Sequence, residues 1–276
     1  MSEQLRIGTL LRLPQMTAEM LAFLKGAGLE TTQIARADDN WMSGEGGAQQ
    51  SEESFRLLAE HGLDCVSLFM MMAPGTTGDG FVTEEWRASR MLFATRQILW
   101  AKKHGIKYIT CHVGALSTIG EGAPYERMIA DFRQLLRFAE EADQFFLFET
   151  GPESVAGLKQ IFADIDSPNL GINFDPANML YYNHDDPSVL LEEMWQHIKV
   201  VHCKDAVRPA PGEQHGHETV LGQGGTNFVQ LMHNLLGKGY RGPLVIEREL
   251  PYGPEQQKDV AEAIQLLKEI RKPYLS

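Results

Sequence analysis

The stretch Phe145-Phe146-Leu147-Phe148-Glu149 is a short apolar run that ends on a carboxylate. Three later runs repeat this plan and end on other side chains that bind metal ions: Leu170 to Phe174 before Asp175, Ile198 to Val201 before His202, and Leu244 to Ile246 before Glu247. Short apolar runs of this kind are typical of buried strands. If the four runs are neighbouring parallel strands, their carboxyl ends share one edge and the four side chains meet there.

The remainder of the chain alternates apolar runs with longer segments of helical period, which indicates a parallel sheet with connecting helices. Eight strands are expected, near residues 5–10, 30–35, 64–70, 107–112, 145–149, 170–175, 197–203 and 243–247. Gly62, Gly105 and Gly239 each follow a helical segment and predict helix ends, because glycine tolerates the left-handed conformation found there. Eight such units without a break in composition predict an α/β fold: a single (β/α)8 TIM barrel over residues 1–276.

Two classes of partner are disfavoured. The turn Gly8-Thr9-Leu10-Leu11-Arg12 lacks the G-x-G-x-x-G pattern, and G-x-x-x-x-G-K-[ST] is absent from the chain, so a nucleotide cofactor is not expected. Lys and Arg number 25 against 37 Asp and Glu, and the resulting net charge of −12 repels a polyanion. We therefore expect no nucleic acid partner.

The compartment is predicted from the cysteines and the N-terminal residues. Cys65, Cys111 and Cys203 are dispersed and lie in or beside apolar runs, which favours buried free thiols over disulfides. The first apolar run is short and contains Arg6, so neither a signal peptide nor a membrane span is expected. A cytoplasmic protein without a membrane partner is the prediction.

Glu149, Asp175, His202 and Glu247 together predict a metal site. Three carboxylates and one imidazole suit one divalent ion, Mn²⁺, Mg²⁺ or Co²⁺, and tolerate Zn²⁺. Any one of these residues could instead cap a helix or pair with a lysine, but capping alone would not select ligand-type side chains at all four strand ends. Polar residues at the carboxyl ends of barrel strands lie where TIM barrels build their active sites.

Further candidates flank these strand ends. His112 ends the run 108–112, Asn178 follows Asp175-Pro176-Ala177, and Lys204-Asp205 follows His202-Cys203. We expect His112, Asn178 and Lys204 to contact substrate, although Lys204 and Asp205 could instead form a mutual surface ion pair. His215 and His217 either cover the mouth of the site or are solvated loop residues, and the second interpretation is the simpler.

The positions expected for Glu149 and Glu247 indicate a proton-transfer reaction. If they face each other across the metal, one removes a proton from a sugar carbon next to a carbonyl and the other returns a proton. The metal would chelate the carbonyl and the adjacent hydroxyl and stabilise the enediolate.

Motifs at these residues resemble the xylose isomerase-like TIM barrel superfamily, in particular its branch of sugar phosphate isomerases/epimerases. The motifs are Cys-His-Val-Gly at 111–114, Phe-Glu-Thr-Gly at 148–151, Asn-Phe-Asp-Pro-Ala-Asn at 173–178, Val-His-Cys-Lys-Asp at 201–205, Leu-Gly-Gln-Gly at 221–224 and Ile-Glu-Arg-Glu at 246–249. The superfamily includes D-tagatose 3-epimerase and, more distantly, endonuclease IV. The resemblance implies that the four strand-end residues bind the metal, that Glu149 and Glu247 are the acid/base pair, and that the partner is a small sugar or sugar derivative. A homo-oligomer is compatible with it.

Departures from the family pattern bear on the substrate. Ketose 3-epimerases carry a substrate-binding Glu six residues after the first metal Glu and a His three residues after the metal Asp, whereas this chain has Val155 and Asn178. An Arg six residues after the metal His recurs as Arg208, which the resemblance makes a substrate-binding candidate. The contacts to the sugar are therefore expected to differ from those of a free-ketose 3-epimerase.

Three alternatives to a metal-dependent sugar isomerase or epimerase remain. The same removal of a proton would make the protein a lyase if it led to β-elimination from a keto-sugar or keto-glycoside. A nuclease like endonuclease IV would need more histidines at the strand ends and conflicts with the net charge. A binding site without activity is disfavoured because all four ligand-type residues are present.

Overall fold

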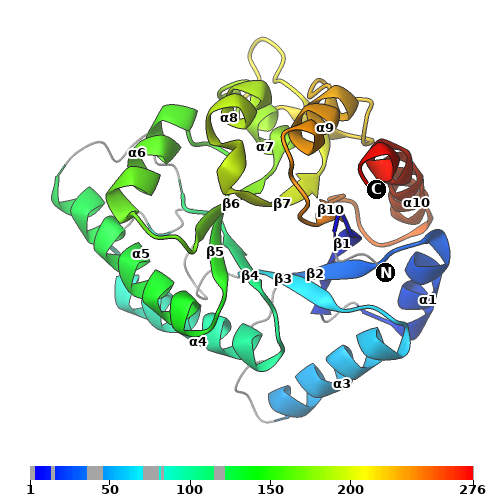
Figure 1. The fold of residues 1–276 in the computed structure, drawn as a ribbon, viewed down its shortest axis with the longest axis horizontal. Helices are drawn as coiled ribbons and strands as arrows, with labels where there is room; N and C mark the ends of the chain where they lie inside the picture. Colours follow the sequence, from blue (N-terminus) through cyan, green and yellow to red (C-terminus); the bar gives the residue numbers. More distant parts are fainter. Residues whose placement is uncertain are drawn as a thin grey trace.

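The protein is a closed barrel of eight parallel strands, as the sequence predicts (Figure 1). The computed structural model describes residues 4–13, 16–35, 46–70, 81, 84–114 and 122–275. Around the barrel the strands follow the order β1-β10-β7-β6-β5-β4-β3-β2. Their bounds are β1 (Ile7–Arg12), β2 (Thr31–Ala35), β3 (Cys65–Phe69), β4 (Tyr108–Cys111), β5 (Phe145–Glu149), β6 (Leu170–Phe174), β7 (Ile198–Cys203) and β10 (Leu244–Ile246).

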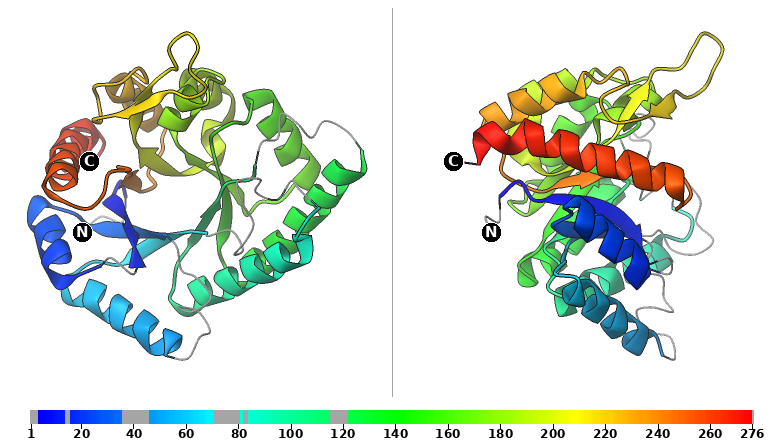
Figure 2. Two further views of the ribbon diagram at one scale, coloured as in Figure 1. Left: turned by 180° about the vertical axis from the view of Figure 1, so that it is seen from behind. Right: turned by 90° about the vertical axis from the view of Figure 1, so that its right-hand side faces the viewer.

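Helices surround the barrel and connect successive strands (Figure 2). They are α1 (Ala18–Ala27), α3 (Gly47–Glu60), α4 (Arg87–Lys103), α5 (Ala123–Glu141), α6 (Val155–Ile165), α7 (Pro176–Tyr181), α8 (Pro187–Met194), α9 (Phe228–Gly237) and α10 (Pro254–Arg271), with 3-10 turns η3 (Trp195–His197) and η4 (Lys272–Tyr274). Gly62, Gly105 and Gly239, the expected helix ends, have φ angles of 64°, 69° and 106°. These values lie in the left-handed region, so the predicted helix ends are confirmed.

One sheet was not expected from the sequence. Strands β8 (Asp205–Val207) and β9 (His217–Thr219) form an antiparallel pair that is not among the eight strands expected from the sequence. The Asp205 carboxylate organises this segment: it accepts hydrogen bonds from the backbone N–H groups of Gly222 and Gly224, each at 3.0 Å, and from the Thr226 hydroxyl at 2.7 Å. Asp205 is therefore a structural anchor, and of the two alternatives for Lys204 and Asp205 the mutual surface ion pair is not the one formed, because Lys204 pairs with Glu247, Asp175 and Glu249.

The alternation of side chains along the strands explains why a polar site forms at one end of the barrel. Side chains two residues apart point to the same face. Leu147, Val200 and Val245 lie two residues before Glu149, His202 and Glu247, and they form a buried apolar cluster. Apolar side chains thus fill the barrel below the strand ends, and the polar side chains are held at the rim on a closely packed floor.

The three cysteines, Cys65, Cys111 and Cys203, are buried free thiols, as predicted. Within the described ranges, no helix combines the length and apolar character that crossing a bilayer requires.

At the opposite end of the barrel, Glu30 and Arg271 form an ion pair. The Glu30 carboxylate accepts hydrogen bonds from both terminal nitrogens of Arg271, at 2.5 and 2.9 Å, and from the backbone N–H of Ile7 at 2.9 Å. Arg271 also donates to the carbonyl of Leu5 at 2.6 Å. This cluster joins the start of β1 to the end of α10. Burial would raise the pKa of Glu30, but the bonds from Arg271 and Ile7 outweigh it and lower the pKa.

Substituting Glu30→Gln is expected to lower the free energy of unfolding by about 1–3 kcal/mol at pH 7, because a charged pair is replaced by weaker neutral bonds. A lowered pKa means that the ionised group stabilises the fold above its unfolded pKa of about 4.3, and that this contribution is lost as the pH falls through the folded pKa. Urea unfolding at pH 7 and at pH 4 or below checks this, with exposed Glu19→Gln as control. An equal difference at both pH values would contradict it.

Candidate metal centre

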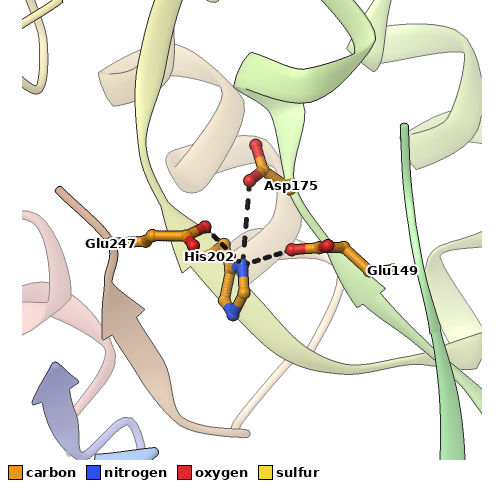
Figure 3. Close-up of side chains that lie close together, drawn as sticks. All are labelled: Glu149, Asp175, His202 and Glu247. Atoms are coloured by element: carbon orange, nitrogen blue, oxygen red, sulfur yellow. Dashed lines mark ion pairs between the residues drawn. The ribbon is translucent and has the colours of Figure 1, made fainter. Parts of the chain in front are cut away.

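Glu149, Asp175, His202 and Glu247 converge at the carboxyl ends of four adjacent strands, as the sequence predicts (Figure 3). Glu149 ends β5, Asp175 follows β6, His202 lies in β7 and Glu247 follows β10. One ligand atom from each residue lies within 4.8 Å of the others. The strands β5, β6, β7 and β10 are consecutive neighbours in the barrel, so the convergence follows from the strand order.

Three carboxylates approach a single nitrogen of His202. The distances to Nδ1 are 2.7 Å from Glu149 Oε1, 3.0 Å from Glu247 Oε2 and 3.7 Å from Asp175 Oδ2. The other ring nitrogen, Nε2, donates to Oε1 of Gln33 at 2.6 Å. Because Gln33 occupies Nε2, Nδ1 is the ring atom left to face the carboxylates.

These residues fit a divalent cation. Nδ1 of His202, both oxygens of Glu149 and Oδ2 of Asp175 are buried, and among the described residues they face one another, Glu247, His112 and Lys204. Three closely spaced carboxylates repel one another unless a positive charge lies between them. One imidazole nitrogen and three carboxylate oxygens are ligands that Mg²⁺, Mn²⁺, Co²⁺ and Zn²⁺ accept in proteins. The four residues can therefore hold one metal ion.

The protonation of His202 reflects the same need for positive charge. Burial would lower the pKa of His202, but the charges of Glu247 and Glu149 raise it well above its ordinary value. Burial would likewise raise the pKa of Glu247, and the charges of Lys204 and His202 reverse that effect and lower it. A proton or a metal ion at Nδ1 supplies the charge that this cluster requires.

Metal binding is therefore expected to release about one proton per chain at neutral pH, since Nδ1 loses its proton to become a ligand. The sign follows from the raised pKa of His202: the ring is protonated in the absence of metal, so the affinity for the ion falls as the pH falls. Calorimetric titration with Mn²⁺ in two buffers of different ionisation enthalpy measures the proton count. A binding enthalpy that is the same in both buffers would contradict this expectation.

Asp175 combines helix capping with its place in the cluster. Its Oδ1 accepts the backbone N–H of Asn178 at 2.9 Å and so caps α7, while Oδ2 faces His202. The hydroxyl of Thr150 accepts the N–H of Asp175 and donates to its carbonyl, both at 2.8 Å. The capping interpretation and the ligand interpretation are thus both compatible with this residue, because each uses a different oxygen.

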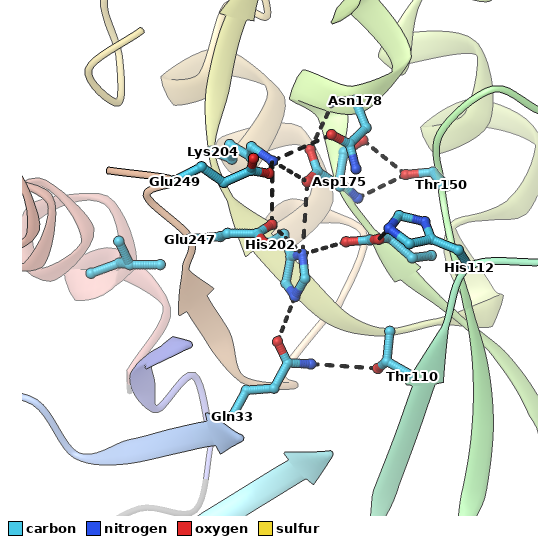
Figure 4. A network of polar contacts seen from close by, with 12 residues as sticks. Gln33, Thr110, His112, Thr150, Asp175, Asn178, His202, Lys204, Glu247 and Glu249 are labelled. Carbon is cyan, nitrogen blue, oxygen red and sulfur yellow. Dashed lines mark hydrogen bonds and ion pairs between the residues drawn. The ribbon is translucent and has the colours of Figure 1, made fainter. Parts of the chain in front are cut away.

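Lys204 is a buried cation beside the cluster (Figure 4). Its Nζ lies 3.5 Å from Glu247 Oε2, 3.8 Å from Asp175 Oδ2 and 3.4 Å from Asn178 Oδ1, and it donates a short hydrogen bond to Glu249. Burial would lower the pKa of Lys204, but Glu247, Asp175 and Glu249 raise it. Lys204 and Asn178, both predicted substrate contacts, therefore lie beside the candidate metal ligands.

His112 approaches the cluster from β4. Its Nε2 lies 2.9 Å from Glu149 Oε2, and 45% of its side chain is exposed. Desolvation would lower the pKa of His112, but the Glu149 carboxylate outweighs it and raises the pKa to about 9. His112 therefore connects a buried carboxylate with the exterior of the barrel.

Three other candidates lie elsewhere. Arg208 is exposed and donates to Oδ1 of Asn183 and to the carbonyl of His184, so its contacts are with the turn after α7 and not with the cluster. His215 stacks on Tyr181 with the ring centroids 5.1 Å apart, and His217 pairs with Glu213 at 3.0 Å on the surface. His217 is thus exposed, whereas His215 is half-buried against Tyr181.

Gln33, Thr150 and Glu249 belong to the site but were not assigned from the sequence. Gln33 comes from β2 and also donates to the Ser67 hydroxyl at 2.8 Å, which fixes its amide. The available signal was a polar side chain within the strand Thr31–Ala35, all of whose residues are buried. A buried polar residue in a strand needs a partner, and here the partner is His202.

Comparison with known proteins identifies the family of this chain. Residues 21–270 match the xylose isomerase-like TIM barrel family. No curated protein matches the sequence significantly.

Similar solved structures include a xylose isomerase domain protein from Planctomyces limnophilus, which is 28% identical, with a TM-score of 0.86 and 98% of this chain and 99% of that one covered. A magnesium complex of a xylose isomerase-like TIM barrel protein from Mycobacterium smegmatis is 18% identical, with a TM-score of 0.76 over 100% and 98% of the two chains. D-psicose 3-epimerase from Clostridium cellulolyticum H10 is 13% identical, with a TM-score of 0.72 over 99% and 100%. At these low identities the last two show the fold alone. With the family match covering most of its length, the chain belongs to the xylose isomerase-like TIM barrel family.

Proposed function

We propose that the protein is a metal-dependent sugar isomerase or epimerase that moves a proton next to a carbonyl group through an enediolate. The observation that carries this proposal is the arrangement of Glu149 and Glu247, which approach His202 Nδ1 from opposite sides at 2.7 and 3.0 Å (Figure 3). Two carboxylates that face each other can address the two faces of one carbon. Membership of the family and the epimerases among the similar structures support the same reaction class.

Glu149 and Glu247 act as the acid/base pair in this proposal. The pKa of Glu247 is lowered by Lys204 and His202 against the effect of burial, so this carboxylate is ionised at neutral pH and can accept a proton. Burial would raise the pKa of Glu149, but His112 and His202 lower it, and the half-exposed His112, with Nε2 at 2.9 Å from Glu149 Oε2, can pass protons between Glu149 and the exterior. A divalent ion held by Glu149, Asp175, His202 and Glu247 would polarise the carbonyl and offset the charge of the enediolate.

Lys204, Asn178 and His112 orient the substrate. Lys204 presents an ammonium group and Asn178 an amide beside Asp175, and both are more than nine-tenths buried. Donors held in this way can bind hydroxyl or carbonyl oxygens of a sugar at little cost in side-chain entropy. Arg208 is not included in this set because of its contacts with Asn183 and His184.

Exchange of substrate protons with solvent tests the proposal. The protein loaded with Mn²⁺ or Mg²⁺ is incubated in D₂O with a panel of ketoses, keto-sugars and keto-glycosides, and deuterium next to the carbonyl is followed by NMR. We expect incorporation into at least one compound and none after chelation. Absence of incorporation into every compound that binds would contradict the proposal.

Analysis of the products separates the related reactions. Inversion of one centre or migration of the carbonyl is the expected result, whereas release of the substituent from a keto-glycoside would show that the same proton removal leads to elimination.

A further inference from the structure

A cavity of about 560 Å³ opens beside the metal centre, next to the ends of β1 and β10. Its walls come from the end of β1, from α1, from the segment after β10 and from α10. Helices α1 and α10 are neighbours on the outside of the barrel (Figures 1 and 2). The cavity therefore extends outward from the rim, away from the barrel axis.

Glu247 connects the cavity with the metal centre. Of the four candidate ligands it is the one that lines the cavity, and its side chain is 14% exposed, whereas those of Glu149, Asp175 and His202 are at most 1% exposed. The ligand that is open to a bound molecule is thus the one that faces the cavity. A substrate that reacts between Glu149 and Glu247 can extend past Glu247 into this space.

The wall of this cavity combines polar and apolar side chains. Leu11, Met20, Leu24, Leu250, Tyr252 and Val260 contribute to it. Two charged residues of the inner wall already have partners: Arg248 is paired with Glu218 at 2.7 Å and with Asp259 at 2.9 Å, and Glu249 is bound to Lys204. Arg12, at the end of β1, also lines the cavity and carries a positive charge. An apolar group would therefore pack away from Arg12, against the aliphatic and aromatic side chains of α1, α10 and the segment after β10.

The volume also exceeds what a single sugar ring requires. Cavities of about 300–1,000 Å³ in proteins typically enclose ligands of drug size. A free ketose would fill the region between the two glutamates and leave the wall formed by α1 and α10 in contact with water.

We propose that this cavity is a subsite for an apolar substituent on the substrate, so that the protein acts on a sugar derivative that carries a ring-sized apolar group and not on a free ketose. The identity of the reacting part rests on the proposed function; the subsite rests on the cavity. Burial of one ring between Met20, Leu24 and Tyr252 strengthens binding by about 10- to 100-fold, as expected for 1.5–3 kcal/mol of apolar burial.

Hydroxamates test the subsite without a known sugar, because their two adjacent oxygens bind a metal ion and their substituent can be varied. Protein loaded with Mn²⁺ is titrated calorimetrically with acetohydroxamate and with benzo-, phenylaceto- and 3-phenylpropionohydroxamate. We expect at least one aryl compound to bind 10-fold or more tightly than acetohydroxamate. Equal affinities, or no binding by any of the four, would overturn the proposal.

Variants locate the effect. Tyr252→Ala removes a ring from the outer wall, where the residue is 42% exposed, and Leu250→Arg places a charge in the cavity. Both are expected to reduce the advantage of the aryl compound at least threefold and to leave acetohydroxamate binding within twofold. Phe23→Ala is the matched control, since Phe23 lies on α1, is exposed and does not line the cavity. Loss of the aryl advantage in the control alone would contradict the assignment.

The two proposals fail separately. Deuterium exchange without an aryl advantage would leave the reaction in place and remove the subsite. An aryl advantage that depends on Tyr252, without exchange in any bound compound, would leave the subsite in place and remove the reaction.

Discussion

Replacing His202 by alanine is expected to weaken Mn²⁺ or Mg²⁺ binding by more than 100-fold and to abolish turnover. The substitution removes the nitrogen on which Glu149, Asp175 and Glu247 converge and leaves three carboxylates without their central partner. Loss of a residue that only orients a ligand typically weakens a metal site by about 10- to 100-fold, and loss of the ligand itself exceeds this. Calorimetric titration measures the affinity, and thermal unfolding with and without metal shows whether the ion still stabilises the fold.

Two further variants provide comparisons for the metal affinity of His202→Ala. Gln33→Leu removes the acceptor of the His202 Nε2–H and is expected to weaken metal binding by about 10- to 100-fold. His197→Ala, in the turn before β7, replaces a histidine outside the cluster and should leave the affinity unchanged. Binding by His202→Ala that equals that of the unsubstituted protein would show that the four residues do not form the metal site.

Substituting Glu247→Gln is expected to lower kcat by at least 100-fold while some metal binding persists. The amide oxygen remains a ligand, but an amide does not accept and return a proton, and general acid–base catalysis contributes about 10²- to 10⁴-fold. Single-turnover rates at saturating Mn²⁺, together with deuterium incorporation, separate the loss of proton transfer from the loss of metal.

Glu249→Gln provides the comparison for this variant. Glu249 also contacts Lys204 but makes no described contact with His202, so its substitution is expected to reduce kcat less than Glu247→Gln does. Retention of normal turnover and exchange by Glu247→Gln would exclude Glu247 as part of the acid/base pair.

The predictions from sequence were most accurate where one strand suffices to place a side chain. Each of the four barrel strands β5, β6, β7 and β10 ends at or within one residue of its candidate ligand, as the apolar runs indicate. Because strand periodicity and the common direction of parallel strands determine where these side chains point, their meeting could be anticipated.

Residues whose roles depend on another part of the chain were harder to predict. Lys204 and Asp205 are adjacent in sequence, yet Lys204 faces Glu247 and Asp205 accepts hydrogen bonds from residues 222–226. The alternation of side chains along β7 and β8 separates them, and their formal charges alone suggest a pair that the fold does not make. Arg208 was assigned by its spacing from His202, but the β8–β9 pair carries it to Asn183 and His184.

The sequence by itself determined the (β/α)8 architecture and the four residues at the rim. Both depend on features of consecutive residues: the periodicity of apolar side chains and the type of residue that ends each apolar run. Tertiary structure alone decided which atoms face one another: Gln33, 169 residues from His202, sets the ring nitrogen that faces the carboxylates. It also decided that a cavity beside Glu247 extends between the first and last helices of the barrel. Both depend on barrel closure, which brings β1 and β10 together and cannot be read from either strand alone.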